Sequence, residues 1–266
     1  MSRMRNRTDQ HERIVFVHGI TGSRRFFASL EKRLRSGPNT ETLSFDLPGF
    51  GSNKNVTSSY TVDDQLRFMS DVTEKRFPFG QLTLIGHSLG GLLALAWAVD
   101  HLARTSRIVL LNTPLAETRD DIVRAISRER LSWAGILLNH RRLAHLACII
   151  FRRFHLMSAF RFAKPVYVPD DVFHDYTEHN WNSLVETFDH VLLNVPGIPL
   201  IRRIRTVPIL NLIGSEDEDF SRRTVDQANV RNVAIPGGHL MLLEHPYATA
   251  QPIEQFLSET RTIHAN

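Results

Sequence analysis

The chain has 266 residues, which is long enough for one large α/β domain with a buried core. Its 32 Lys and Arg against 28 Asp and Glu give a formal charge of +4, with both signs interspersed, so no nucleic-acid partner is expected. One cysteine, Cys148, excludes an intrachain disulfide, and neither an apolar signal core nor a run of membrane-spanning length is present. We expect a soluble cytoplasmic protein without a membrane span.

The first predicted elements alternate between strand and helix. The apolar run 14–17 predicts a strand that ends at His18-Gly19-Ile20, and Phe27, Leu30 and Leu34 share one face of a following helix. A second strand over 42–45 leads into the loop 46–52, and a helix begins after Thr61, a typical N-cap residue. Such alternation indicates a parallel sheet with helices on both faces.

The next strand, 82–85, runs into the pentapeptide Gly86-His87-Ser88-Leu89-Gly90, and an apolar helix over 92–98 follows. This order of strand, glycine-flanked serine and helix is typical of a sharp turn that holds a serine in a strained backbone conformation with its Oγ exposed. The glycines are needed because side chains there would collide with the neighbouring strand and helix. The helix start also presents free backbone N–H groups.

After a strand over 108–111 the alternation stops. Residues 115–204 contain helical runs, 121–133, 141–162 and 171–193, interrupted by prolines, with no convincing strand. Strands resume over 209–213 and 232–235. The pattern predicts an α/β core formed by residues 1–114 and 205–266, with a helical lid inserted at 115–204.

Two of the later strands also end in chemically active residues. The strand over 209–213 is followed by the acidic turn Gly214-Ser215-Glu216-Asp217, and the last strand ends at Gly237-Gly238-His239. A serine becomes a nucleophile when a histidine accepts its proton and an acid orients that histidine. The chain order Ser, Asp, His is the order expected for a nucleophile-elbow enzyme.

With these motifs the chain resembles the α/β-hydrolase superfamily, in its lidded, esterase- and thioesterase-like branch. The resemblance covers nearly the whole length and includes the motifs at 17–20, 46–52, 86–91, 214–217 and 238–246. It implies that Ser88 is the nucleophile, His239 the general base and Asp217 the orienting acid. It also implies an oxyanion hole formed by the backbone N–H groups of Ile20 and Leu89. Asp217 is preferred to its acidic neighbours because it lies three residues after Gly214.

Two features depart from that family. Members usually have two more strands before the His-Gly loop, so we expect a sheet trimmed to six parallel strands. Pro252 lies inside the predicted final helix, 246–260, and should make that helix start late or kink.

The resemblance also limits the reactions that we expect the protein to catalyse. A serine rather than an aspartate at position 88 disfavours epoxide hydrolysis and dehalogenation. We expect hydrolysis of an ester, thioester or lactone of a hydrophobic acyl or aromatic small molecule, including an acyl group on a carrier, with His87, Leu115 and Trp133 as candidate substrate contacts. C–C bond hydrolysis, acyl transfer, a non-hydrolytic cyclisation or elimination, and a receptor-like binding role stay open as alternatives. The histidines show no spacing typical of a metal site, and no cofactor is expected.

Overall fold

A single six-stranded sheet forms the centre of the molecule. The computed structural model describes residues 11–37, 39–128, 133–153, 168–176, 179–217 and 222–263. All strands pair in parallel in the order β2-β1-β3-β4-β5-β6, which confirms the expected architecture. The strands are β1 (Glu12–Val17), β2 (Thr40–Ser44), β3 (Leu82–His87), β4 (Thr105–Leu111), β5 (Ile209–Gly214) and β6 (Val230–Ile235).

Both faces of the sheet are buried. Along β1, Val15 and Val17 belong to one hydrophobic cluster, whereas Ile14 and Phe16 belong to the other. Because neighbouring residues of a strand point to opposite faces, this alternation requires an apolar layer on each side. The central strands are therefore mainly apolar, as their sequences indicated.

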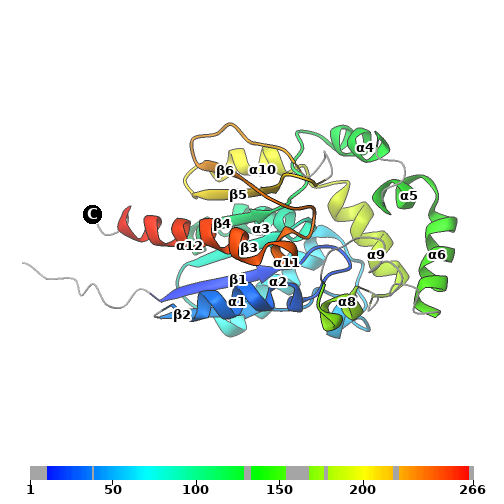
Figure 1. Cartoon of the computed structure of the whole chain (residues 1–266), viewed down its shortest axis with the longest axis horizontal. Helices are drawn as coiled ribbons and strands as arrows, with labels where there is room; N and C mark the ends of the chain where they lie inside the picture. Colours follow the sequence, from blue (N-terminus) through cyan, green and yellow to red (C-terminus); the bar gives the residue numbers. More distant parts are fainter. Residues whose placement is uncertain are drawn as a thin grey trace, which may run out of the picture.

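Helices supply these two layers (Figure 1). One face is covered by α1 (Ala28–Arg35), α11 (Met241–Glu244) and α12 (Pro246–Ile263). The other is covered by α2 (Val62–Arg76), α3 (Leu89–Asp100) and α10 (Gly197–Arg203). Thr61 caps α2 as predicted, since its side chain accepts a hydrogen bond from the Asp64 N–H. Short 3-10 helices span Arg24–Phe27, Gly51–Asn53 and Leu102–Arg104.

The final helix does not start late. α12 begins at Pro246 and contains Pro252 within its span, so that part of the expectation is wrong. Pro246 stands at the first helical position, where a missing N–H costs nothing, and this favours an early start. Ala250, Ile253 and Phe256 then pack on the sheet, which offsets the hydrogen bond that Pro252 cannot donate.

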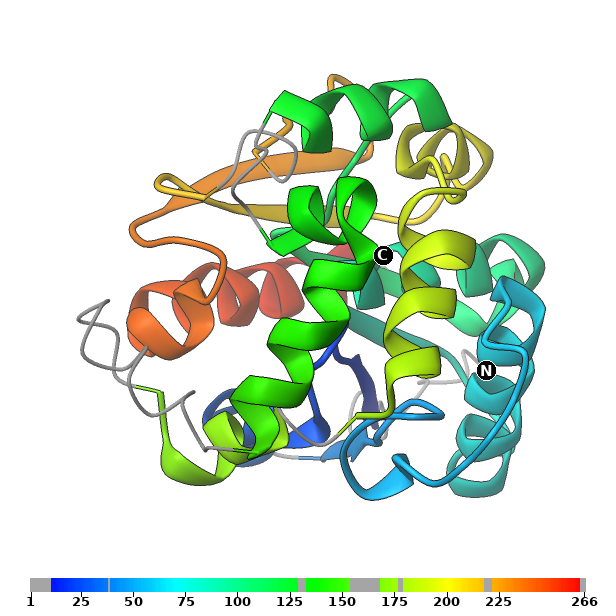
Figure 2. The ribbon, with the colours of Figure 1, turned by 90° about the vertical axis from the view of Figure 1, so that its right-hand side faces the viewer.

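A run of helices separates β4 from β5, and all of its labelled members except α10 lie toward the carboxyl end of the sheet (Figure 1). It consists of α4 (Arg119–Arg128), α5 (Trp133–Asn139), α6 (Arg141–Arg153), α8 (Asp170–Asp175), α9 (Trp181–Thr187), a π-helical turn (Phe188–Leu192) and α10. The predicted run 121–133 is split between α4 and α5, and the predicted run 141–162 is helical to Arg153 and then leaves the described residues. In Figure 2, α6 crosses the front of the molecule as an outer element.

Within the described residues, no single helix is long and apolar enough to cross a membrane. Two neighbouring helical segments, Trp181–Leu192 and Gly197–Arg203, reach such a length only together, and they are bent by 55°.

Candidate active site

Ser88 occupies the sharp turn between β3 and α3. Its backbone has φ 53° and ψ −124°, a strained combination for a residue with a side chain. The turn is held because the Ser88 N–H donates to the Leu111 carbonyl at 2.8 Å. A Cβ on Gly90 would lie 2.1 Å from the Val17 carbonyl oxygen, and one on Gly86 would lie 2.5 Å from the Gly90 oxygen. The close approach of β3, α3 and β1 therefore requires glycine at both positions.

His239 and Asp217 meet at the carboxyl end of the same sheet. The Nδ1–H of His239 donates to the Asp217 carboxylate, at 2.9 Å from Oδ2 and 3.1 Å from Oδ1. The Asp217 side chain is 1% exposed, whereas that of His239 is 30% exposed. A buried carboxylate that accepts from Nδ1 fixes the ring orientation and leaves Nε2 as the basic nitrogen.

Three further side chains hold the loop that carries His239. Asn112 donates from Nδ2 to the carbonyls of Gly238, at 2.9 Å, and His239, at 3.1 Å, while its Oδ1 accepts from the Gly214 N–H at 2.6 Å. Asn112 is buried at the end of β4 and thus links the turn before Asp217 to the His239 loop. Glu244 accepts from the Gly238 N–H at 2.6 Å. Asn112 is not among the site residues that the sequence predicts. The feature that points to it is its position as a polar residue directly after an apolar central strand.

His87 is the third of these side chains. Its Nε2–H donates to the His239 carbonyl at 2.9 Å, and its ring lies 4.2 Å from that of Phe26, centroid to centroid. Burial, reinforced by the neighbouring His239 charge, holds the pKa of His87 well below 6.5. The structure thus places this candidate substrate contact as a neutral, buried support of the His239 loop.

The loop after β1 lies against the serine turn. A Cβ on Gly19 would lie 3.0 Å from the Ser88 Cβ. His18 fixes this loop, because its Nδ1–H donates to the Gly19 carbonyl at 2.7 Å and its Nε2 accepts from the Leu47 N–H at 2.9 Å. Both contacts require the neutral ring, and burial accordingly lowers the pKa of His18.

Asp46, which follows β2, accepts a hydrogen bond from the loop after β1 and so links the two. Burial alone would raise the pKa of Asp46, but hydrogen bonds from the N–H of Arg24 and from Ser52 outweigh it, and the pKa lies below its usual range. An ionised Asp46 therefore fixes the end of the loop that begins at His18.

Two backbone N–H groups lie in the turn of the serine and in the loop packed against it. Of the residues that the structure describes, none accepts a hydrogen bond from the backbone N–H of Ile20 or Leu89. Leu89 is the first residue of α3, where the helix cannot satisfy the N–H and its dipole adds positive potential. Ile20 follows Gly19, which packs on Ser88.

The other candidate substrate contacts have different surroundings. Leu115 is buried and packs against α10, where a Cβ on Gly197 would lie 2.6 Å from its Cδ2. Trp133 begins α5, but its side chain lies outside the described residues. The side chains of four phenylalanines of the insertion also lie outside the described residues: Phe151, Phe154, Phe160 and Phe162.

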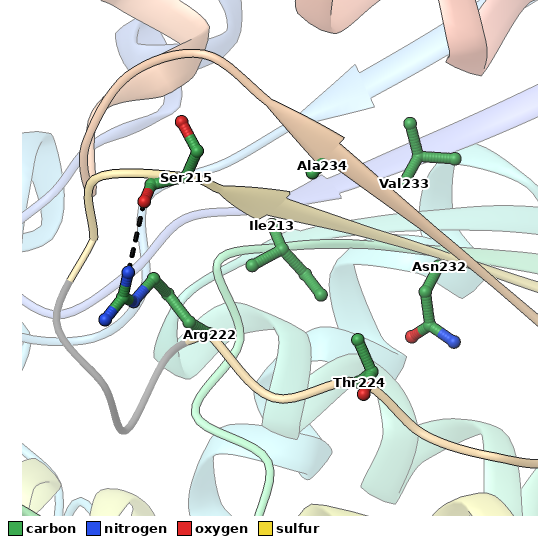
Figure 3. A pocket seen from close by; sticks show the side chains of 7 residues that line it. All are labelled: Ile213, Ser215, Arg222, Thr224, Asn232, Val233 and Ala234. Atoms are coloured by element: carbon green, nitrogen blue, oxygen red, sulfur yellow. Dashed lines mark hydrogen bonds between the residues drawn. The ribbon is translucent and has the colours of Figure 1, made fainter.

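A pocket of about 490 Å³ lies on the outer strands β5 and β6 (Figure 3). It is lined by side chains of Ile213, Ser215, Arg222, Thr224, Asn232, Val233 and Ala234. Arg222 closes one side by donating to the Ser215 carbonyl at 3.1 Å. None of Ser88, Asp217 and His239 lines this pocket, which lies instead beside the turn that leads to Asp217. Across the part of the chain that the structure describes, no group of three or more His, Cys, Asp or Glu side chains is placed to hold a metal ion.

Comparisons with known proteins identify the family and the fold. The model of the alpha/beta hydrolase family matches residues 14–251. The solved structure of MenH from S. aureus has a TM-score of 0.72 and 19% identity, covering 95% of this chain and 96% of that one, and so shares the fold.

Curated relatives match a smaller region. The chain is 26% identical over 153 residues to "Probable lysophospholipase BODYGUARD 4" of Arabidopsis thaliana, covering 54% of this chain and 36% of that protein. It is 28% identical over 120 residues to a Bacillus subtilis protein that carries the name of a 2-succinyl-6-hydroxy-2,4-cyclohexadiene-1-carboxylate synthase, covering 42% of each. These matches span less than half the length of either relative. The family match over most of the chain, together with the parallel sheet and its serine turn, shows that this protein belongs to the alpha/beta hydrolase family, whose members are hydrolases or related enzymes.

Proposed function

We propose that the protein is a serine hydrolase that cleaves an ester, thioester or lactone through an acyl-enzyme on Ser88. The observation that carries this proposal is the 2.9 Å contact between His239 and the buried Asp217, on loops beside the strained Ser88 turn. A nucleophile, a base and an orienting acid at the carboxyl ends of β3, β6 and β5 are the groups that acyl transfer needs.

In the first half of the reaction, Nε2 of His239 takes the proton of the Ser88 hydroxyl as Oγ attacks the substrate carbonyl. Asp217 stabilises the imidazolium that forms and keeps its proton on Nδ1. The alcohol or thiol then leaves with the proton that His239 returns to it. Water then attacks the acyl-enzyme, with His239 again accepting a proton and returning it, and Ser88 is regenerated.

The negative oxygen of each tetrahedral intermediate needs donors that are already in place. The unpaired N–H groups of Ile20 and Leu89 are our candidates, because one lies in the loop packed on Ser88 and the other directly follows it. Each such donor typically contributes about 3 kcal/mol to the transition state.

For the substrate we propose a hydrophobic acyl or aromatic ester, including an acyl group bound to a carrier. The helical segment from α4 to α9 is our candidate for the lid that would enclose it, since it lies over the carboxyl end of the sheet. The lysophospholipase name of the plant relative supports a long acyl chain.

The test is hydrolysis of p-nitrophenyl esters of increasing acyl length. We expect turnover by the wild type, none above background for Ser88→Ala, and a loss of about 10⁴-fold in kcat for Asp217→Asn, which disturbs the histidine tautomer. Asp226→Asn is the matched control, because Asp226 is an exposed aspartate of the same connection between β5 and β6. Full activity of Ser88→Ala would contradict the proposal.

A second candidate is a non-hydrolytic cyclisation or elimination in which His239 moves a proton from carbon. The synthase name of the Bacillus subtilis relative favours it. An enzyme of this kind would turn over no ester at any acyl length while keeping a folded, intact site.

A further inference from the structure

Helix α6 contacts residues 179–189 mainly through polar side chains and turns large apolar side chains to solvent. The inner stripe consists of Arg141, Ala144, His145 and Cys148, of which Ala144 packs on the hydrophobic core while Arg141 and His145 remain exposed. Arg141 pairs with Asp189. His145 stacks on Trp181 with the ring centroids 4.4 Å apart, and Cys148 Sγ lies 3.7 Å from His179 Nε2.

The opposite side of α6 is apolar. Eight large apolar side chains are strongly exposed among the described residues, and half of them lie here. This outer stripe consists of Leu143, Leu146, Ile149 and Ile150, with exposed fractions of 61%, 54%, 52% and 38%. A helix that merely covered a globular core would have the reverse arrangement. Such a concentration of exposed apolar side chains marks an interaction surface.

The charge of the helix indicates what that surface contacts. α6 contains four arginines and no acidic residue. Arg142 is exposed at the start of the outer stripe, and α6 has no carboxylate of its own to offset the charge. An exposed apolar stripe accompanied by arginine is typical of a helix that lies in the headgroup region of an anionic membrane.

A second copy of the chain is a poorer fit for this stripe. A stable protein–protein interface uses about 20–30 residues on each side, whereas the outer stripe offers four side chains on a single helix of 13 residues. A repeated cationic charge on both partners would also oppose self-association.

We propose that α6 is an interfacial helix that docks the protein on an anionic lipid surface through its outer stripe. Because α6 lies beyond the carboxyl end of the sheet (Figures 1 and 2), docking would turn the side that carries Ser88 toward the lipid. Docking does not depend on catalysis, so it can be measured with Ser88 removed.

The experiment is flotation of the full chain carrying Ser88→Ala with phosphatidylcholine vesicles, with and without phosphatidylserine. We expect the protein to float with the anionic vesicles and to be released by salt, which screens the arginines. Leu146→Ser/Ile149→Ser should weaken binding at least about tenfold. Arg142→Glu should weaken binding to anionic vesicles selectively.

The matched control is Phe79→Ser/Leu102→Ser, which removes two exposed apolar side chains near the amino ends of β3 and β4. It should bind like the parent. Equal binding by both double variants, or no flotation of the parent, would overturn the proposal. So would a lower Tm of Leu146→Ser/Ile149→Ser, which would show that the chain itself covers the stripe, or a loss of dimers in that variant, which would assign the stripe to a second copy.

Discussion

At the scale of single residues, the site depends on side chains that hold its loops as much as on those that react. Asn112 is the clearest case, because one amide bridges the turn before Asp217 and the loop of His239. Its own backbone has φ 46°, a value that asparagine tolerates better than most residues. Asparagine therefore suits this position both because it tolerates the backbone conformation and because its amide makes these hydrogen bonds.

Asn112→Ala should slow reaction of Ser88 with a fluorophosphonate by up to about a hundredfold, because a shift of about 1 Å in a catalytic group costs that much. Asn211→Ala is the control, since Asn211 is a buried asparagine on β5 that bonds to Arg223 and Asn232, away from the site. Both variants should lower Tm, but only the first should lower the labelling rate. An equal effect of the two on labelling would show that Asn112 has only a structural role.

The buried histidines predict how stability depends on pH. His18 and His87 both have pKa values lowered by burial in the folded protein, so the unfolded chain binds more protons just below the ordinary value of 6.5. Stability should therefore be complete above that value and fall as the pH drops toward about 5. Urea unfolding at a series of pH values measures this slope, and His87→Gln should reduce it. A slope unchanged by that substitution would contradict the neutral, buried state of His87.

At the scale of elements, the sequence predicted the strands well, because buried parallel strands are short apolar runs that end in glycine or polar residues. It also predicted that Ser88, Asp217 and His239 follow strands, since each comes after such a run. It could not reveal that Leu115 faces α10 rather than open space, because an apolar residue fits both positions. From Pro252 it predicted that α12 starts late or kinks; the helix starts at Pro246, because the packing of Ile253 and Phe256 favours helix around the proline.

A buried ion pair links the amino ends of two strands. Arg107 on β4 donates to Glu12 on β1 at 2.7 Å, and Thr83 on the strand between them donates to the same carboxylate at 2.6 Å. Arg107→Leu removes this cation from the buried Glu12 carboxylate and should cost about 3–5 kcal/mol of unfolding free energy.

Urea unfolding of three variants tests this. The double variant Glu12→Leu/Arg107→Leu should recover most of that loss, because it removes both buried charges. Arg124→Ala breaks the exposed pair with Asp121 and should change stability by less than about 1 kcal/mol. A double variant no more stable than Arg107→Leu would contradict this explanation.

At the scale of the whole molecule, a sheet with two covered faces supports a helical segment over its carboxyl end. Loops from β3, β5 and β6 bring Ser88, Asp217 and His239 to that end, although 151 residues separate the serine from the histidine in the chain. Periodicity could predict that the helical segment exists. It could not predict that α6 presents its apolar side to solvent, because the sequence pattern does not say which side of a helix faces the protein.

The central claim is that Ser88 is an activated nucleophile, and covalent labelling by a fluorophosphonate probe tests it most directly. We expect rapid labelling of the wild type at Ser88, none of Ser88→Ala, and strongly slowed labelling of His239→Ala and Asp217→Asn, each confirmed as folded by its Tm. A folded wild-type protein that the probe does not label, or labelling that persists in Ser88→Ala, would contradict the claim.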